Sequence, residues 1–207
     1  PRNEAVYHLA SVDGGASWST EQTVASVSTG SIAATVACAA PADGSIHVAW
    51  SEVAPPHYYP SSGVFYTWSR GSGLDWLPPE QIAGQHYSLP RMAVEAQGDI
   101  LMGWQGDVAV GGRYYRRLAA GAAGVWSAVE TILPPGEGGL SGEMPFAVDS
   151  AGNVHAAVTA DAGIRHVVRS GGAWAQIADL SASLVGLPSS SGSIEQPALT
   201  LADGNRL

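Results

Sequence analysis

The chain has 207 residues, of which 45% are hydrophobic and only 13% charged, a composition that supports a buried core and excludes a disordered tail. Its net charge is −9 and its nine basic residues are all arginines. This balance argues against binding to nucleic acid or to an anionic membrane, because both need clustered positive charge. The single cysteine, Cys38, excludes an intrachain disulfide, and the longest apolar run, residues 32–40, is too short to span a bilayer.

Residues 1–30 are predicted to hold two short strands, at residues 5–9 and 21–24, with the turn segment Ser11-Val12-Asp13-Gly14-Gly15-Ala16-Ser17-Trp18 between them. In the repeat that occupies the rest of the chain, these strands correspond to a third and a fourth strand. Residues 1–30 are therefore expected to form the second half of a repeat unit.

Three complete repeat units follow, over residues 31–86, 87–141 and 142–195. Each has a short apolar run, a glycine turn, a second apolar run, a third run rich in aromatic and β-branched residues, a Trp and a fourth short run. The turn glycines are spaced 54, 54 and 52 residues apart and are Gly44, Gly98, Gly152 and Gly204. Residues 196–207 carry a first strand and the start of a second.

Each unit thus predicts four short antiparallel strands, and no stretch keeps a helical period. Proline opens the first strand in three copies, where its missing N–H does no harm, at Pro90, Pro145 and Pro197. Four-stranded units repeated at this length are typical of β-propeller blades. We therefore predict an all-β chain of three complete blades with half-blades at 1–30 and 196–207. We expect it to be part of a longer protein and to form an open arc, or to have termini that pair imperfectly, rather than a closed ring of four blades.

The segment from Ser11 to Trp18 resembles the Asp box, Ser-x-Asp-x-Gly-x-Thr-Trp, of the sialidase (neuraminidase) superfamily, with Ser17 in place of Thr. Degenerate copies stand at residues 69–76, 119–126 and 170–174. The resemblance implies a β-propeller in which this hairpin is structural, its defining residues being Ser11, Asp13, Gly15 and Trp18. Asp13 is expected to accept backbone N–H groups within the turn, and Trp18 to fill the gap between neighbouring sheets.

Sialidases, as a family, hold the sialic-acid carboxylate with three arginines and use a Tyr–Glu pair as nucleophile with an Asp as acid–base. No such set can be assigned in this sequence, so its catalytic residues stay undefined. Arg91, directly after Pro90, is a candidate for a ligand pocket at the start of an innermost strand. The alternative is a salt bridge at the surface or between blades.

Two loop acids and one aromatic cluster are further candidates for ligand binding. Glu143 and Glu195 each stand two residues before a strand-opening proline, where they suit a cation or a sugar hydroxyl, or else act as solvated loop acids or backbone caps. His57, Tyr58 and Tyr59 suit stacking on a sugar ring, or else pack beneath their own loop.

His47 and His155 occupy matching places in second strands, which favours a hydrogen bond between blades over a metal site, since ligands at metal spacing are missing. No cofactor is expected. The long loops, residues 52–63, 84–89, 134–144 and 181–196, are predicted to lie on one face of the arc, with Glu143 and Glu195 on its concave side. Asp13 and Trp18 are predicted at the opposite end.

The sequence favours a non-catalytic module that binds a carbohydrate or another extracellular ligand, in a secreted or cell-surface protein. One alternative is a piece of a sialidase-like glycoside hydrolase whose catalytic residues lie in other blades. Another is a structural repeat in a large surface protein. The expected partners are a glycan or similar ligand and the remaining blades of the same protein, with no nucleic acid and no membrane span.

Overall fold

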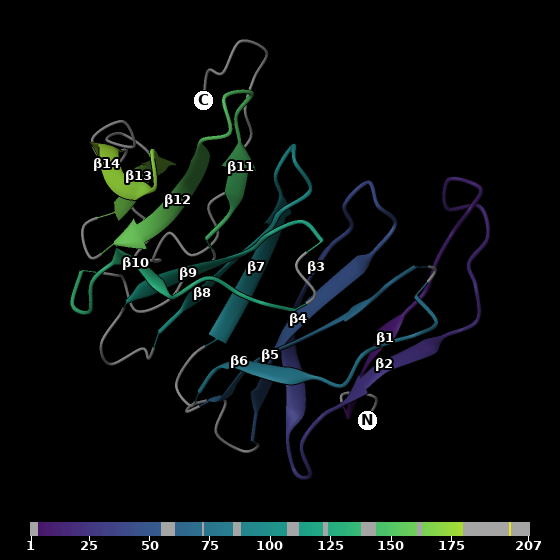
Figure 1. Cartoon of the computed structure of the whole chain (residues 1–207). Coiled ribbons are helices and arrows are strands. Elements are labelled where there is room, and N and C mark those ends of the chain that lie inside the picture. The colour runs from purple at the N-terminus through teal and green to yellow at the C-terminus, as the bar shows by residue number, and fades with distance from the viewer. Residues whose placement is uncertain are drawn as a thin grey trace. The chain divides into compact units, whose positions relative to one another are not determined.

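A computed structural model describes residues 4–54, 61–71, 73–84, 88–106, 112–121, 124–137, 144–160, 163–179 and 199. Throughout these residues the chain forms β-strands and no helix, and the strands make four antiparallel sheets (Figure 1). The chain divides into two compact units, Pro1–Pro90 and Arg91–Leu207. The described part contains no helix long and apolar enough to cross a membrane.

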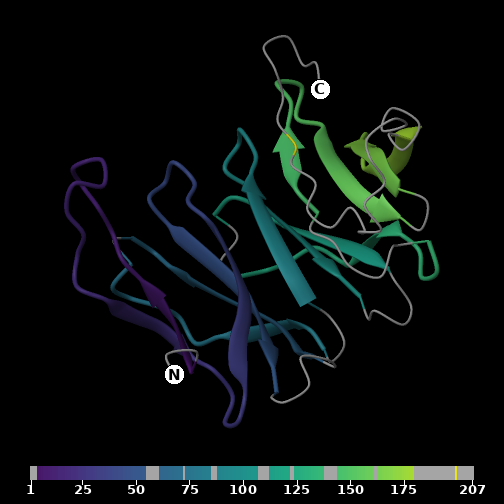
Figure 2. The same cartoon turned by 180° about the vertical axis from the view of Figure 1, so that it is seen from behind.

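The first unit holds a two-stranded and a four-stranded sheet, in which neighbouring strands follow one another in chain order (Figures 1 and 2). The pairing of β1 with β2 confirms the strand pair predicted for residues 1–30. β4 lies between β3 and β5 and is buried at every residue but the first. The strands are β1 (Ala5–His8), β2 (Gln22–Ser26), β3 (Ile32–Ala39), β4 (Ile46–Val53), β5 (Ser61–Ser69) and β6 (Glu80–Ala83).

From β7 onward the chain forms two further four-stranded sheets, β7 to β10 and β11 to β14, each again in chain order. The prediction of four-stranded antiparallel sheets is therefore confirmed for three successive repeats. The strands are β7 (Ser88–Val94), β8 (Ile100–Gln105), β9 (Arg113–Leu118), β10 (Glu130–Leu133), β11 (Phe146–Val148), β12 (Val154–Ala160), β13 (Gly163–Ser170) and β14 (Ala173–Asp179).

The turn between the first and second strand of each sheet has the same geometry. Its glycine has a positive φ, which a residue with a Cβ adopts only under strain. The glycine N–H donates to the carbonyl three residues earlier. The values are φ 83°, 89° and 82° for Gly44, Gly98 and Gly152, with N–H···O distances of 3.2 Å to Pro41, 2.8 Å to Glu95 and 3.0 Å to Asp149. The predicted equivalence of these turns is confirmed.

Within each unit, one sheet packs on the next through apolar side chains. In the first unit the core joins β1 and β2 to β4 and comprises Val6, Val24, Ala25, Val48 and Trp50. In the second unit the core joins β8, β9 and β10 to β12 and β13, and its largest members are Leu101, Tyr115, Ile132, Leu133 and Met144. Each sheet is therefore stabilised largely by burying one face against its neighbour.

Gly103, in β8, marks a close approach between the two sheets of the second unit. A Cβ at Gly103 would overlap the side chains of Phe146 and Met144. The corresponding residues in the other repeats are Ala49 and Ala157, so a small residue stands at this position in all three four-stranded sheets.

Two predicted strand boundaries are wrong. The loop expected at residues 52–63 is shorter, because β4 runs to Val53 and Glu52 pairs with Gly63 across the ladder. Pro90 does not open its strand, because β7 begins at Ser88. Proline is tolerated inside β7 because β7 is an edge strand, where a missing N–H need not break a ladder bond.

Candidate functional site

The structure describes only one of the predicted ligand residues. Arg91 lies half-buried in the middle of β7 rather than at the start of a strand. The five others, His57, Tyr58, Tyr59, Glu143 and Glu195, lie outside the described residues. Their predicted placement on one face, and that of the two glutamates on a concave side, therefore stay predictions.

The hairpin between β1 and β2 has the hydrogen bonds to Asp13 that were expected within this turn. Asp13 Oδ1 accepts the Ser17 N–H at 2.9 Å and the Ser11 hydroxyl at 2.8 Å, and Asp13 Oδ2 accepts the Ser17 hydroxyl at 2.5 Å. The Ser11 Oγ in turn accepts the Gly15 N–H at 2.7 Å. The hydrogen bonds from Ser17 and Ser11 lower the pKa of Asp13 to about 2, so this carboxylate stays ionised at any physiological pH.

Trp18 does not fill a gap between sheets, and that prediction is wrong for this structure. Its side chain is 62% exposed. Its counterpart Trp76 packs against the core that joins β1 and β2 to β4, and its ring contacts His8 edge-on at 5.8 Å. Trp76 is thus covered by the sheet that precedes its own. No sheet of the described residues precedes β1 and β2, so nothing covers Trp18 in this way.

The second hairpin keeps its turn without the aspartate. Gly71 stands where the first hairpin has Asp13, and the Ser69 hydroxyl donates to the Gly71 carbonyl at 3.1 Å. The Trp76 indole N–H donates to the Gly73 carbonyl at 2.8 Å. Backbone acceptors therefore replace the carboxylate in this copy.

A polar cluster lies beside the glycine turn of each four-stranded sheet. In the first of these sheets, Asp43 Oδ1 accepts the Ser45 hydroxyl at 2.6 Å, His47 Nε2 lies 2.9 Å from Ser45 Oγ, and His47 Nδ1 lies 2.7 Å from the Tyr66 hydroxyl. Because the Ser45 hydroxyl donates to Asp43, Ser45 Oγ accepts a hydrogen bond from His47. The proton of neutral His47 is therefore assigned to Nε2, and Nδ1 accepts from the Tyr66 hydroxyl. Burial lowers the pKa of His47 to about 4, against the attraction of Asp43.

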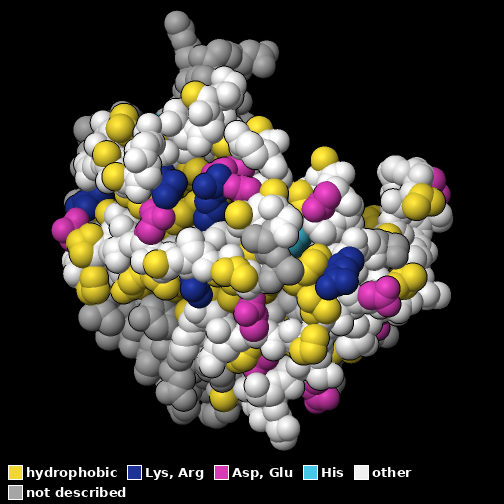
Figure 3. Space-filling view, viewed as in Figure 1, with side chains coloured by type: hydrophobic (Ala, Val, Ile, Leu, Met, Phe, Trp, Pro, Cys, Tyr) yellow, Lys and Arg dark blue, Asp and Glu magenta, His cyan; other side chains and the backbone are white. Residues whose placement is uncertain are grey.

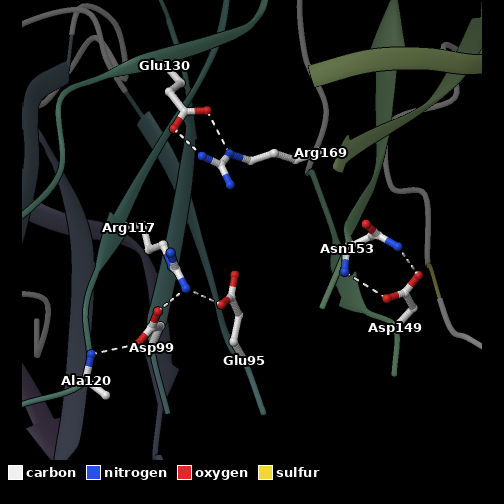
Figure 4. Close-up of polar contacts among 8 residues, drawn as sticks. All are labelled: Glu95, Asp99, Arg117, Ala120, Glu130, Asp149, Asn153 and Arg169. Carbon is white, nitrogen blue, oxygen red and sulfur yellow. Dashed lines mark hydrogen bonds and ion pairs between the residues drawn. The ribbon is translucent and has the colours of Figure 1, made fainter. Parts of the chain in front are cut away.

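In the sheet formed by β7 to β10, a cluster of ion pairs lies beside the glycine turn. Arg117 contacts both Glu95, at 2.8 Å, and Asp99, while Asp99 Oδ1 also accepts the Ala120 N–H at 2.7 Å (Figure 4). Arg117 on the third strand thus holds both ends of the turn that joins the first strand to the second.

The last sheet places a histidine pair beside its turn. Asp149 accepts the Asn153 backbone N–H at 2.8 Å and the Asn153 side chain at 2.7 Å (Figure 4). His155 Nε2 lies 3.3 Å from Asp149 Oδ2, and His155 Nδ1 lies 3.0 Å from His166 Nε2. Burial opposes ionisation of Asp149, but its hydrogen bonds outweigh burial and lower its pKa to about 2.

The predicted hydrogen bond between blades through His47 and His155 is therefore wrong. Both histidines bond within their own sheet, to Tyr66 and His166, because these residues lie on the adjacent third strand. The matching positions reflect a polar contact between the second and third strands of the first and last four-stranded sheets.

The side chains that do join neighbouring sheets were not singled out by the sequence. Arg169 on β13 donates two hydrogen bonds to the Glu130 carboxylate on β10, at 2.8 and 2.9 Å (Figure 4). These hydrogen bonds raise the pKa of Arg169. Arg113 on β9 is fully buried and donates to Thr159 on β12 at 3.0 Å. Burial lowers the pKa of Arg113 to about 10, so it remains a cation at neutral pH.

Glu52 plays a similar part in the first unit. Its buried carboxylate accepts the Ser28 N–H at 3.0 Å and the Trp50 indole N–H at 3.1 Å, so it ties the segment after β2 to β4. In the next repeat Trp104 is equivalent to Trp50, but Gly106 stands in place of Glu52. The Trp104 indole N–H is buried without a hydrogen-bond partner among the described residues.

The buried ionisable groups described above therefore serve internal contacts. Among the residues that the structure describes, no group of three or more His, Cys, Asp or Glu is arranged to hold a metal ion. Asp149, His155 and His166 are linked by a row of hydrogen bonds. His166 is buried, however, and its ring is stacked on that of His155, with 5.2 Å between the ring centroids. This geometry suits structural bracing and offers no exposed nucleophile.

No protein-family model and no curated protein matches this chain. Among solved structures, the chain is similar to the crystal structure of a protein of unknown function from Dyadobacter fermentans DSM 18053. The TM-score is 0.51 at 16% identity, and the match covers 70% of this chain and 53% of that chain. The chain thus spans about half the length of that protein. At this identity the likeness concerns the all-β fold alone.

Proposed function

We propose that the chain is a run of sialidase-like β-propeller blades that binds a ligand without catalysing a reaction. Support comes from three successive four-stranded antiparallel sheets with the same glycine turn and from sheet-on-sheet packing within each unit. The observation that carries the proposal is the hydrogen-bonded turn at Ser11 to Ser17, whose sequence resembles an Asp box and which lies between β1 and β2.

The proposal of a non-catalytic role rests on how the described ionisable side chains are used. His155, His166, Arg117 and Arg169 each bond to another residue of the same unit, as do the carboxylates they meet. Groups committed to such contacts are poorly placed to exchange protons with a substrate. Ligand binding is then left to loops on a rigid scaffold, where propellers commonly keep it.

A carbohydrate is the ligand class we propose, in a secreted or cell-surface setting. The loop between β4 and β5 carries His57, Tyr58 and Tyr59 in the sequence, and aromatic rings suit the apolar faces of sugars. Asp75 lies after the other end of β5 in the sequence and is separated from this segment by the whole strand, so it serves as a control position.

The test is a glycan array probed with the full chain and with a variant carrying His57→Ala, Tyr58→Ala and Tyr59→Ala. We expect glycan binding by the unaltered chain, loss of binding in the triple variant, and unchanged binding in the control Asp75→Asn. Fluorogenic sialosides are assayed in parallel. Hydrolysis would establish the glycosidase alternative, and an array without any binding would favour a structural repeat.

A further inference from the structure

Two histidine rings meet between the second and third strands of the sheet formed by β11 to β14. His155 Nδ1 on β12 lies 3.0 Å from His166 Nε2 on β13, and the rings are stacked with 5.2 Å between their centroids. His166 is 5% exposed, and hardly any histidine surface, drawn in cyan, shows on the face of the molecule in Figure 3. We call these two residues the histidine pair, and the contact between them is largely shielded from water.

Asp149, in the turn before β12, fixes the protonation of one ring nitrogen of the pair. Its carboxylate accepts two hydrogen bonds from Asn153 (Figure 4). Burial opposes ionisation of this carboxylate, but its hydrogen bonds outweigh burial and lower its pKa to about 2. An ionised carboxylate can only accept, so His155 Nε2, which lies 3.3 Å from Asp149 Oδ2, carries a proton. His155 Nδ1 is therefore the nitrogen left to face His166.

The contact between the two rings has room for one proton. When both rings are neutral, His166 Nε2 donates to His155 Nδ1, and after uptake of one further proton one of these two nitrogens still accepts. Uptake of a second further proton places two N–H groups and two positive charges face to face, which removes the hydrogen bond and adds repulsion. The contact therefore survives the first protonation of the pair and is lost on the second.

The strands beside the pair supply no charge that would offset a second proton. The two arginines of β13, Arg165 and Arg169, alternate with His166 along the strand and bond to Glu137 and Glu130 instead. Within the described part of the chain, Asp149 is thus the charged group that meets the pair. The residues paired with the two histidines across the ladders are all apolar: Ala147 and Val168 beside His155, and Ala157 and Ala178 beside His166.

The other two four-stranded sheets fill the same positions with different residues. The sheet formed by β3 to β6 has His47 and Tyr66, and the sheet formed by β7 to β10 has Leu101 and Tyr115. Neither combination brings two imidazoles together. The chain itself therefore provides one version of the contact with a single histidine and one version with none.

We propose that the histidine pair is an acid-sensitive switch, in which uptake of a second proton separates the two rings and loosens β12 from β13. The last sheet then opens in mildly acidic surroundings, while the sheet formed by β7 to β10, which has no histidine at this position, keeps its pairing. This property is independent of the ligand proposed above.

The direction of the pH dependence follows from where protons bind first. Burial, and to a lesser extent the charge of neighbouring His155, lower the pKa of His166 from 6.5. The opened chain therefore takes up protons at a higher pH than the folded pair takes up its second proton. The free energy of opening this sheet is complete above pH 6.5 and falls as the pH drops below that value.

The direct test is 15N NMR of the imidazole nitrogens in the full chain, titrated from about pH 8 to about pH 5. Nitrogen shifts distinguish protonated from unprotonated ring positions. We expect His155 Nε2 to be protonated throughout and the pair to titrate in two separate steps, because the first proton opposes the second.

Hydrogen exchange measures whether the sheet opens. Protection factors, which correct for the pH dependence of exchange itself, are compared strand by strand over the same range. We expect those of β12 and β13 to fall about tenfold in acid, the change that corresponds to one pKa unit, and those of β8 and β9 to stay constant.

Three variants assign the effect to the pair. The double variant His155→Leu with His166→Tyr copies the sheet formed by β7 to β10, and its protection at β12 and β13 should not depend on pH in this range. His166→Tyr alone leaves one histidine, so a single titration step should remain. The control is His47→Leu in the other unit, which should leave the response of β12 and β13 unchanged.

The proposal is overturned if protection of β12 and β13 in the unaltered chain is the same at both ends of the range, or if both rings titrate independently near their ordinary pKa. It is also overturned if the double variant keeps the response, or if β8 and β9 lose protection equally, which would show general acid unfolding. The NMR and exchange measurements on the unaltered chain decide the matter even if the double variant fails to fold.

Discussion

Tyr66 and Tyr115 occupy the same position in successive repeats, and both side chains are fully buried. The Tyr66 hydroxyl lies 2.7 Å from His47 Nδ1. In the next repeat Leu101 replaces His47, and the Tyr115 hydroxyl has no hydrogen-bond partner among the described residues. Replacing each tyrosine by phenylalanine therefore removes the same atom from two different environments.

Tyr66→Phe leaves the buried His47 nitrogen without its donor, which costs about 1–3 kcal/mol of the free energy of unfolding. Tyr115→Phe removes a hydroxyl that is already buried without a partner, so we expect a change between about zero and a gain of 1 kcal/mol. The expected difference between the two variants is about 2 kcal/mol.

Urea unfolding followed by tryptophan fluorescence measures both free energies, provided that the slope with urea is unchanged. Hydrogen exchange of β4, β5, β8 and β9 localises each effect to its sheet. The variant His47→Leu copies the next repeat, where Leu101 stands at this position, so Tyr66→Phe added to it should cost much less than Tyr66→Phe alone. Equal costs for Tyr66→Phe and Tyr115→Phe, or a larger cost for Tyr115→Phe, would refute the reasoning.

Burial holds the pKa of His47 at about 4 in the folded chain, against 6.5 in the unfolded chain. Protonation of His47 therefore does not reduce the free energy of unfolding above pH 6.5. The free energy of unfolding should fall by up to about 3 kcal/mol as the pH drops toward 4. In His47→Leu the free energy of unfolding should not show this dependence on pH. Gly103→Ala should cost about 1–3 kcal/mol in urea unfolding, because its Cβ would overlap two side chains, whereas Gly71→Ala, which meets open space, should change little. Glu130→Gln should lower the free energy of unfolding by about 1 kcal/mol, because it weakens the contact with Arg169. The melting temperature should fall accordingly. A melting temperature equal to that of the unaltered chain would show that this contact adds nothing.

Much of the fold is predictable from local patterns. Strand order follows from the repeat, because short runs joined by tight turns pair with their neighbours in the chain. A glycine at the same place in each turn identifies the positive φ at Gly44, Gly98 and Gly152 without any structure. The turn at Asp13 is equally local: in its printed hydrogen bonds, Asp13 accepts from residues within four positions of itself.

Contacts between residues far apart in the chain could not be predicted from local patterns. Trp18 and Trp76 follow similar hairpins, yet one is exposed and the other packed, because only Trp76 has a preceding sheet among the described residues to lie against. Glu52 looks like the first residue of a loop, but the Ser28 N–H and the Trp50 indole make its burial in β4 favourable.

The sequence by itself determined the strands, their order and the turns, since these depend on side-chain alternation and on backbone preferences within a few residues. Tertiary structure alone decided which polar groups pair. Arg169 meets Glu130 and Arg113 meets Thr159 across two sheets, at separations of 39 and 46 residues. Such partners are chosen by how one sheet's face lies on another, and no pattern along a single strand encodes that.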